Sequence, residues 1–474
     1  MTAHVQTTKQ FKTNVKEALV DENIQKALVS TRTGFVGKRA TAKDALPEFD
    51  ELRDAAKAMK DHVLAHLDVY LEAYEQKVLD HGGHVHWAET AEDANRIILD
   101  ICNAADAKIV NKGKSMISEE IDLNEHLEAH GIKAFETDLG EYIIQLRGER
   151  PSHIIAPAIH VTVPQVDALF RKTHTHLPPD RDLSEIATMV HEARAELRQK
   201  YFDSQVGVTG ANMLIAETGQ SVIVTNEGNG DLSQSLPKVH IVIASIEKIV
   251  PTLEDSSLIL RLLGRSATGQ EMSVYNTYSS GPRRAEDPDG PEEYHVVLLD
   301  NGRTNMIGSK FQDMLRCIRC GACMNHCPVY QSIGGHAYGW VYPGPMGAVL
   351  TPALTGVEAG GQLPNASSFC GRCEEVCPMR IPLPNMMRHW REREFEKQLT
   401  PAAVRWGIGV WAIFATRPAI YRFCTRIAMR VMGMMGRKRG RFASMPLAGG
   451  WTDHRDLPAP QGGTFMAQWK GRST

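Results

Sequence analysis

Residues 317–328 read CIRCGACMNHCP, and residues 370–378 read CGRCEEVCP. These two stretches hold seven of the nine cysteines of the chain. In the first stretch, successive cysteines are separated by two, two and three residues, and a proline follows the last one. This spacing is typical of the ligands of cubane iron–sulfur clusters, which transfer single electrons. The sequence therefore predicts a ferredoxin-type domain built around such clusters.

The order of the cysteines also predicts which of them share a cluster. Three thiolates separated by two residues each can hold one cluster on a short loop, whereas the fourth ligates the other cluster in two-cluster ferredoxins. Pro328 and Pro378 would fix the backbone where the chain leaves each cluster. We predict a first cluster held by Cys317, Cys320, Cys323 and Cys377, and a second held by Cys327, Cys370 and Cys373.

The second cluster lacks a fourth cysteine, because Ser367 stands three residues before Cys370. One alternative is a [4Fe–4S] cluster whose fourth iron is bound by Ser367, by a histidine such as His336, by water or by a group from a partner. The other alternative is a three-iron cluster. We favour the four-iron form, and hence two [4Fe–4S] clusters.

Other uses of cysteine fit this chain less well. Structural zinc takes four ligands in two pairs, which seven cysteines at this spacing do not match. Disulfides belong to oxidising compartments and to short secreted chains. The two remaining cysteines, Cys102 and Cys424, lie among apolar residues, so we expect both to be core thiols rather than ligands.

Length and composition predict an ordinary multidomain globular protein. The chain has 474 residues, of which 42% are hydrophobic and 23% charged, so two or three domains are expected. The N-terminus opens no apolar segment of the kind that directs secretion, and no run of eighteen apolar residues occurs. We therefore expect a cytoplasmic protein, in a compartment that keeps thiols reduced.

Hydrophobic periodicity predicts an α/β domain with a mainly parallel sheet, because strand and helix patterns alternate. A long amphipathic helix is expected over 49–79. The predicted strands are 84–87, 108–110, 133–137, 153–156, 239–244, 273–277 and 296–299, with two more around a Thr-Gly turn within 210–229. The predicted helices are 91–104, 118–130, 163–172, 183–202 and 253–263.

Four regions follow from these patterns. We predict an N-terminal arm (1–48) that packs on the body, an α/β domain (49–300), a mainly helical two-cluster ferredoxin domain (305–395) and a basic segment (396–474). The ferredoxin domain is expected to be helical because forty-two residues separate Cys327 from Cys370, far more than a compact ferredoxin needs.

The last region carries most of the positive charge. Residues 401–474 contain twelve Lys and Arg against two Asp, although the whole chain has a net charge of −3. Within 401–441 an apolar patch is followed by a predicted helix with apolar and arginine-bearing faces. Such a segment can lie on an anionic membrane surface, dock an acidic partner or pack back on the acidic body. We do not expect it to span a membrane, since Arg interrupts both apolar stretches.

The cysteine region, the segment 210–229 and the segment 112–121 (KGKSMISEEI) together resemble lactate-utilisation protein B, a family of iron–sulfur proteins of bacterial L-lactate oxidation. The resemblance extends over nearly the whole chain. It implies an α/β domain of the lactate-utilisation type, akin to sugar-isomerase and CoA-transferase folds, and a complex with two sister proteins. It also implies that the seven cysteines are the ligands of two [4Fe–4S] clusters, with Ser367 in the place of an eighth.

The α/β domain offers a weaker candidate site. Lys112, Lys114, Glu119 and Glu120 lie where a strand meets a helix, a common ligand position in parallel sheets, and Lys114 suits a carboxylate or phosphate. Glu217 resembles a remnant of a CoA-transferase nucleophile. The simpler interpretation is that the lysines are solvated and the glutamates stabilise a helix terminus. No Gly-x-Gly-x-x-Gly motif or P-loop occurs, so neither NAD nor ATP is expected, and no nucleic-acid partner is expected.

These observations predict a non-catalytic subunit that carries electrons between a lactate-oxidising partner and a further acceptor. Two alternatives remain open. The α/β domain could itself oxidise a hydroxy acid or transfer acyl groups, with the clusters as its electron sink, or the chain could be a redox or iron sensor.

Overall fold

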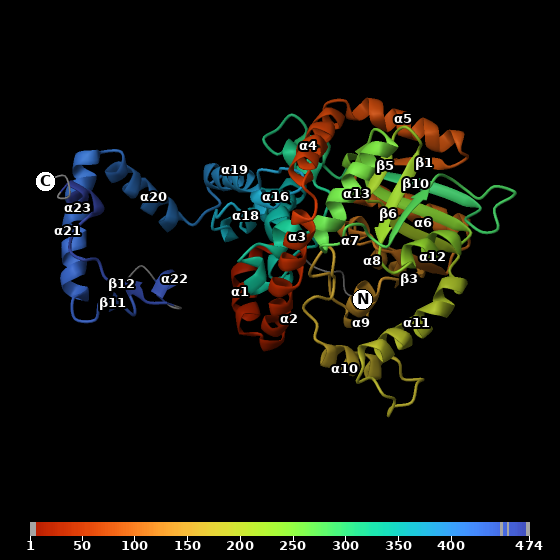
Figure 1. Ribbon diagram of the computed structural model, residues 1–474, viewed down its shortest axis with the longest axis horizontal. Helices are drawn as coiled ribbons and strands as arrows, with labels where there is room; N and C mark the ends of the chain where they lie inside the picture. Colours follow the sequence, from red (N-terminus) through yellow and green to blue (C-terminus); the bar gives the residue numbers. More distant parts are fainter. Residues whose placement is uncertain (1–5, 446–448, 453–454, 471–474) are drawn as a thin grey trace. The chain divides into compact units, whose positions relative to one another are not determined.

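The computed structural model describes residues 6–445, 449–452 and 455–470 of the chain (Figure 1). The chain divides into two compact units, residues 1–393 and 394–474. The first contains two β-sheets and the two cysteine runs, whereas the second is mainly helical.

The centre of the first unit is a six-stranded sheet in which every neighbouring pair is parallel. Its order is β1-β10-β7-β4-β2-β3, and the strands are β1 (His84–Ala88), β2 (Ile109–Gly113), β3 (Lys133–Glu136), β4 (Val206–Gly210), β7 (Val239–Ser245) and β10 (Glu293–Leu299). Alternate residues serve opposite faces: Val297 packs on one side and Val296 on the other. The predicted parallel α/β sheet is confirmed.

Helices cover both faces of this sheet (Figure 1). One face packs against α6 (Ala91–Ala104) and α8 (Leu123–Ala129), and the other against α4 (Phe49–Ala65) and α5 (Leu67–Asp80). Burial on both faces explains why the central strands are apolar along their whole length. Cys102 is buried in the first of these cores, as the sequence predicts.

A second, four-stranded sheet has the order β8-β5-β6-β9. Its strands are β5 (Met213–Ile215), β6 (Gln220–Thr225), β8 (Ile249–Val250) and β9 (Tyr275–Ser279). β5 and β6 form the hairpin that the Thr-Gly turn predicts. Together with α13 (Leu253–Ala267), this sheet shares one apolar core with the cysteine region, since Ile215 and Ile259 belong to the same buried cluster as Met346 and Trp390.

Three predicted elements differ from the structure. The helix over 49–79 is interrupted at His66, which separates α4 from α5. The helix over 118–130 is two helices, α7 (Met116–Glu120) and α8, because Asp122 has a left-handed backbone with φ 52°. The strand at 153–156 is absent, since Nδ1 of His153 accepts the N–H groups of Ile155 and Ala156 that a strand would pair with a neighbour.

The N-terminal region forms three helices, α1 (Phe11–Val20), α2 (Glu22–Thr33) and α3 (Phe35–Asp44). They pack against the cysteine region. The Nε2 of Gln25 donates to the Ser332 carbonyl at 2.9 Å, and Phe11 packs on Tyr338 with ring centroids 5.5 Å apart. Residues that read as a polar arm are thus part of the body of the first unit.

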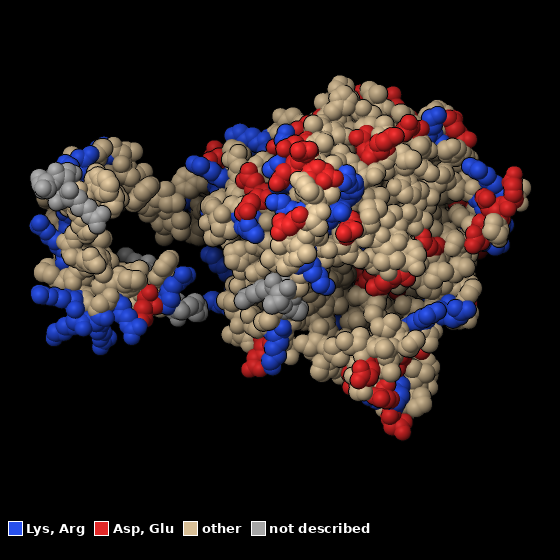
Figure 2. All heavy atoms as spheres, in the orientation of Figure 1, with Lys and Arg blue, Asp and Glu red and all other residues tan. Residues whose placement is uncertain are grey.

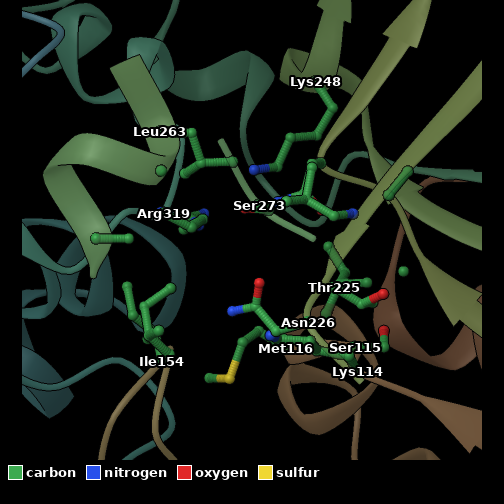
Figure 3. A pocket seen from close by; sticks show the side chains of 18 of the residues that line it. Lys114, Ser115, Met116, Ile154, Thr225, Asn226, Lys248, Leu263, Ser273 and Arg319 are labelled. Atoms are coloured by element: carbon green, nitrogen blue, oxygen red, sulfur yellow. The ribbon is translucent and has the colours of Figure 1, made fainter. Parts of the chain in front are cut away.

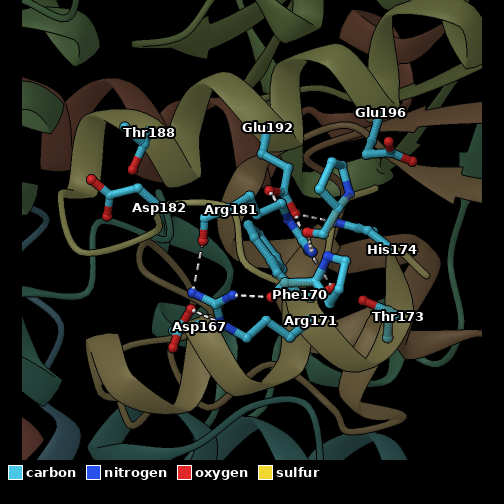
Figure 4. A network of polar contacts seen from close by, with 12 residues as sticks. Asp167, Phe170, Arg171, Thr173, His174, Arg181, Asp182, Thr188, Glu192 and Glu196 are labelled. Carbon is cyan, nitrogen blue, oxygen red and sulfur yellow. Dashed lines mark hydrogen bonds and ion pairs between the residues drawn. The ribbon is translucent and has the colours of Figure 1, made fainter. Parts of the chain in front are cut away.

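A helical insertion separates β3 from β4. It consists of α9 (Leu139–Arg147), α10 (Val163–Thr173) and α11 (Ile186–Asp203). Figure 4 shows the polar network that joins the last two of these helices. The Glu192 carboxylate accepts from Nε and Nη2 of Arg181 at 2.6 and 2.8 Å and lies 2.7 Å from Nδ1 of His174. A small apolar core beside it contains Tyr142 and Phe170.

The cysteine region is built from short helices, in agreement with the predicted helical character. They are α14 (Ala322–Asn325), α15 (Tyr330–Ile333), α16 (Gly344–Thr355), α17 (Val357–Gly360), α18 (Arg372–Glu375) and α19 (Leu383–Glu396). Single 3-10 turns connect several of them, such as Gln312–Arg316 and Leu363–Ala366.

The second unit contains α20 (Ala402–Ala415), α21 (Pro418–Gly436), α22 (Gly449–Thr452), α23 (Phe465–Lys470) and a two-stranded sheet of β11 (Arg441–Phe442) and β12 (Leu457–Pro458). Lys and Arg side chains gather on this unit (Figure 2). Cys424 on α21 is exposed, so the prediction of a core thiol there is wrong; α21 buries only Gly436.

No helix of the described ranges combines the length and the apolar character needed to cross a bilayer.

Candidate metal centre

The two cysteine runs are built on the same backbone plan. In the first, Arg319 and Gly321 flank Cys320 with positive φ values of 59° and 73°, and α14 begins directly afterwards. In the second, Phe369 and Gly371 flank Cys370 with φ values of 54° and 80°, and α18 follows. Glycine suits these left-handed positions because it has no Cβ. In each run these left-handed residues turn the chain sharply on both sides of the central cysteine.

The structure sorts the seven cysteines into two cavities. One is lined by Cys317, Cys320, Cys323 and Cys377, so the last cysteine of the second run joins the first three of the first run. The rest of its lining is almost wholly apolar and includes Ile154, Met314, Ile318, Met379 and Leu383.

The other cavity is lined by the remaining three cysteines, Cys327, Cys370 and Cys373. Ser367 lines it as well, beside Ser368 and Tyr338. His336 does not. Its Nε2 donates to the Arg150 carbonyl at 2.7 Å, and its ring lies against His160 with centroids 4.3 Å apart. Of the two protein side chains proposed for the fourth iron, the structure brings only Ser367 to this cavity.

Several of these thiols are protonated at pH 7 while no metal is bound. Burial, together with nearby thiols, raises the pKa of Cys320 to about 12 and that of Cys373 to about 12. Burial also raises the pKa of Cys377 to about 11. Such thiols are neutral at pH 7, and iron binding would displace their protons. Two groups of convergent sulfur donors are the chemistry that iron–sulfur clusters require.

Buried arginines from the N-terminal helices support the second run. Arg53 on α4 donates from Nε and Nη2 to the Cys377 carbonyl at 3.1 and 2.8 Å, and Arg39 on α3 donates to the Val376 carbonyl at 2.8 Å. Both arginines are at most 6% exposed. Sequence reasoning missed them, because one arginine in a helix carries no local signal of its partner more than three hundred residues away.

A buried histidine supports the first run in the same way. His153 lies 2.9 Å from Oδ1 of Asn325, which belongs to α14 between Cys323 and Cys327. Burial lowers the pKa of His153 to about 4, so the ring is neutral at pH 7. Since its Nδ1 accepts two backbone N–H groups, its Nε2 carries the proton that Asn325 accepts.

The charged residues at the strand ends differ from their predicted roles. Lys112 is fully buried between Glu119 and Glu136, at 2.5 and 2.6 Å, so it is not a solvated charge. Burial alone would lower the pKa of Lys112, but these carboxylates raise it above its ordinary value. Glu217 is exposed and accepts the N–H of Leu253 at 3.1 Å, which stabilises the start of α13.

Glu120 belongs to a second buried ion network. Its two oxygens accept from Arg303 at 2.9 and 2.7 Å and from the Tyr342 hydroxyl at 2.5 Å. Arg303 also lies 3.1 Å from Glu247, which in turn lies 3.5 Å from Arg319 in the first cysteine run. This chain of charges joins the α/β sheet to the first cysteine run, and Glu120 is a structural residue rather than a helix-terminal charge.

Family comparisons agree with this architecture. The chain matches the family models of the LUD domain over residues 71–299, of the 4Fe-4S dicluster domain over 313–381, and of the C-terminal region of lactate utilisation protein B over 387–474. Lactate utilization protein B of Bacillus pumilus is 40% identical over 98% of this chain and 98% of its own length. The chain belongs to the lactate utilization protein B family.

Other members of the lactate utilization protein B family show similar identity. That of Bacillus licheniformis is 39% identical over 98% of this chain and 97% of its own length. The uncharacterized electron transport protein YkgF of Escherichia coli K12 is 40% identical over 97% of this chain and 96% of its own length. The family resemblance expected from the sequence is confirmed, and the dicluster match covers all seven cysteines.

One solved structure, a duf162 family protein from Deinococcus radiodurans, matches 49% of this chain and 98% of its own at 15% identity. Its TM-score of 0.26 is too low to establish a shared fold.

Proposed function

We propose that this chain is the electron-transfer subunit of a multi-protein system that oxidises L-lactate to pyruvate. The observation that carries the proposal is the sorting of seven cysteines into two cavities within a dicluster domain. A [4Fe–4S] cluster in each cavity would accept and release one electron at a time. The names of the relatives, which refer to lactate utilization and electron transport, support the pathway.

We assign the ligands as the cavities group them. Cys317, Cys320, Cys323 and Cys377 would hold the first cluster, and Cys327, Cys370 and Cys373 the second, with Ser367 at its fourth iron. The lining of the first cavity is almost wholly apolar, whereas Cys370 at the second cavity is exposed to solvent. The Arg39 and Arg53 guanidinium groups place positive charge beside the second run.

The remaining parts of the proposal rest on the family. We place the chain in the cytoplasm, where thiols stay reduced, and assign its α/β domain to the sugar-isomerase and CoA-transferase type. Lactate oxidation itself would occur on a sister subunit.

Metal analysis and a dye assay test this function. The full chain, purified without oxygen, should contain about seven to eight iron and as much acid-labile sulfide. It should reduce a dye with L-lactate only when its sister subunits are present. A zinc-loaded, iron-free chain would overturn the metal assignment, whereas dye reduction by the chain alone would favour catalysis in the α/β domain.

We further propose that α20 and α21 bind an acidic surface of a sister subunit. Within its unit α20 buries no residue, and Trp406 and Trp411 are 76% and 62% exposed. α20 has one charged residue, Arg405, and is otherwise apolar. Such a helix is typical of a buried position, whereas helices that lie on membranes have a broad polar face. The nine Lys and Arg of 401–441 favour an acidic partner.

Co-purification tests this surface. The double variant Trp406→Ser, Trp411→Ser should lose its sister subunits, while Trp451→Ser, a matched change at another exposed tryptophan, should keep them. Retention of the sister subunits by the double variant, with loss of binding to anionic vesicles, would show that α20 faces a membrane instead.

A further inference from the structure

A second kind of cavity, of about 120 Å³, lies at the carboxyl ends of β2, β4 and β7. Lys114 follows β2, Ala211 and Asn212 follow β4, and Lys248 follows β7 in the 3-10 turn Ile246–Lys248. The carboxyl ends of parallel strands are where open α/β sheets bind their ligands. The position is therefore suited to a small molecule.

Three positive side chains surround this cavity, and no Asp or Glu is among the residues that line it. They are Lys114, Lys248 and Arg319, each from a different segment (Figure 3). The Lys248 side chain reaches into the cavity in Figure 3. The hydroxyl of Thr225, which is 2% exposed and also lines the cavity, has no hydrogen-bond partner among the described residues.

The lysines of this cavity differ from other lysines near the sheet. Lys112 lies between two carboxylates, and Lys60 donates to the carbonyls of Glu247 and Ile249 at 2.5 and 3.0 Å. Lys114 and Lys248, in contrast, have no hydrogen bond or ion pair with any residue of the described ranges. Glu227 attracts Lys114 and Glu247 attracts Lys248 only from beyond ion-pair distance. A partly buried ammonium without a partner is costly, and an anion in the cavity would supply one.

The surroundings of Lys248 agree with this reading. Burial and the nearby Arg319 guanidinium lower the pKa of Lys248 to about 8. Within the described ranges, Arg319 has one carboxylate partner, Glu247 at 3.5 Å, and that carboxylate is shared with Arg303. Among the residues that line the cavity, positive charge thus exceeds negative charge.

We propose that this cavity binds the oxyanion of a small molecule, a carboxylate or a phosphate, through Lys114, Lys248 and Arg319. Its volume accommodates a ligand of the size of a 2-hydroxy or 2-oxo acid or of inorganic phosphate.

The site adjoins the first cysteine cavity. Ile154 lines both cavities, and Arg319 stands between Cys317 and Cys320 in the chain. If the proposed function holds, a bound anion adds negative charge beside the first cluster. This charge disfavours the reduced form of the cluster, which carries one more electron. Occupation of the site should therefore lower the reduction potential of that cluster, which links small-molecule binding to electron transfer.

Isothermal titration calorimetry on the full chain, purified with its iron, tests the site. The probes are L-lactate, pyruvate, inorganic phosphate and lactamide, a neutral analogue of lactate. At least one anion should bind, and lactamide should not. Binding of lactate or pyruvate alone assigns the site to carboxylates, and binding of phosphate alone assigns it to phosphates. If none of the three anions binds at concentrations up to about 10 mM, the proposal is overturned.

Matched variants locate the binding. Lys248→Gln and Lys114→Gln should each weaken it about tenfold or more, because each removes a charge-assisted hydrogen bond. Lys133→Gln, at an exposed residue that begins β3 at the opposite end of the sheet, should leave it unchanged. Equal affinity in wild type and both cavity variants would overturn the site. Binding is measured without electron transfer. The proposed anion site can therefore be confirmed or overturned independently of the iron content and the dye assay, which test the proposed function.

Discussion

Ser367 occupies in the second cysteine run the place that Cys317 occupies in the first. Each follows a short 3-10 turn and has an extended backbone, with φ −65° and ψ 120° at Cys317 and φ −71° and ψ 133° at Ser367. Sγ of Cys317 accepts the N–H of Arg319 at 3.4 Å, and Oγ of Ser367 accepts that of Phe369 at 3.1 Å. The two runs thus differ here by a sulfur replaced by an oxygen on the same backbone.

Ser367→Cys should make the second cluster resistant to oxidation. An oxygen donor binds iron less well than a thiolate, so brief oxidation of the wild type should give a three-iron paramagnetic signal from about one cluster per chain. Electron paramagnetic resonance should show that signal suppressed in the variant. Ser184→Cys, at an exposed loop residue, should behave as wild type. Equal signals in wild type and Ser367→Cys would show that Ser367 does not face the iron.

Cys320→Ser should remove the first cluster alone. Iron per chain should fall from about eight to about four, while the six-stranded sheet stays folded because apolar cores on its two faces are separate from the cysteine region. Iron analysis and circular dichroism measure the two effects. Cys424→Ser, the same change at an exposed cysteine, should keep all the iron. Complete loss of soluble protein would instead mean that cluster binding and the folding of the sheet are one cooperative event.

The contact between α10 and α11 should weaken in acid. Hydrogen bonds from Arg181 hold the pKa of Glu192 below its ordinary value. A carboxyl whose pKa is lowered in the folded state stabilises the fold at pH values above its unfolded pKa of about 4.3. This stabilisation is lost as the pH falls through the pKa of the folded state. Hydrogen exchange, corrected for its intrinsic pH dependence, should show that α10 and α11 open more often once the pH falls below about 4.3.

Glu192→Gln should remove this acid response. At pH 7 it should cost about 3 kcal/mol of local stability, since Arg181 loses its buried partner. Glu196→Gln, which breaks a pair with the exposed His176, should change little. The same acid dependence in wild type and Glu192→Gln would assign it to another group.

Tyr342→Phe should destabilise the contact between the α/β sheet and the cysteine region. The variant removes the hydroxyl that donates to the buried Glu120, a hydrogen bond to a charged group worth about 1.5–3 kcal/mol. The midpoint of thermal unfolding, followed by cluster absorbance, should fall by several degrees. Tyr421→Phe, at an exposed tyrosine of α21, should leave it unchanged. An unchanged midpoint in Tyr342→Phe would show that Arg303 and Asn301 satisfy Glu120 without the tyrosine.

Hydrophobic patterns in short stretches of sequence predicted much of the α/β sheet. They failed where a side chain takes the hydrogen bonds that a strand needs. Buried parallel strands such as β7 and β10 are continuous apolar runs, and this pattern is visible in a short window of sequence. At 153–156 the same apolar pattern is present, yet the side chain of His153 takes the backbone N–H groups and no strand forms. A side-chain competitor for backbone hydrogen bonds leaves no mark in hydrophobic periodicity.

The sequence by itself determined the likeness to iron–sulfur proteins and the two expected groups of cysteines, because the number of residues between thiols limits which of them can meet at one point. Only the tertiary structure decided which charged side chains are buried and which of them have a partner of opposite charge. Lys112 and Lys114 are two residues apart in one stretch, but the first lies between two buried carboxylates and the second faces a cavity without any. Whether a charge is buried, paired or open depends on segments distant in the chain, and no local pattern contains that information.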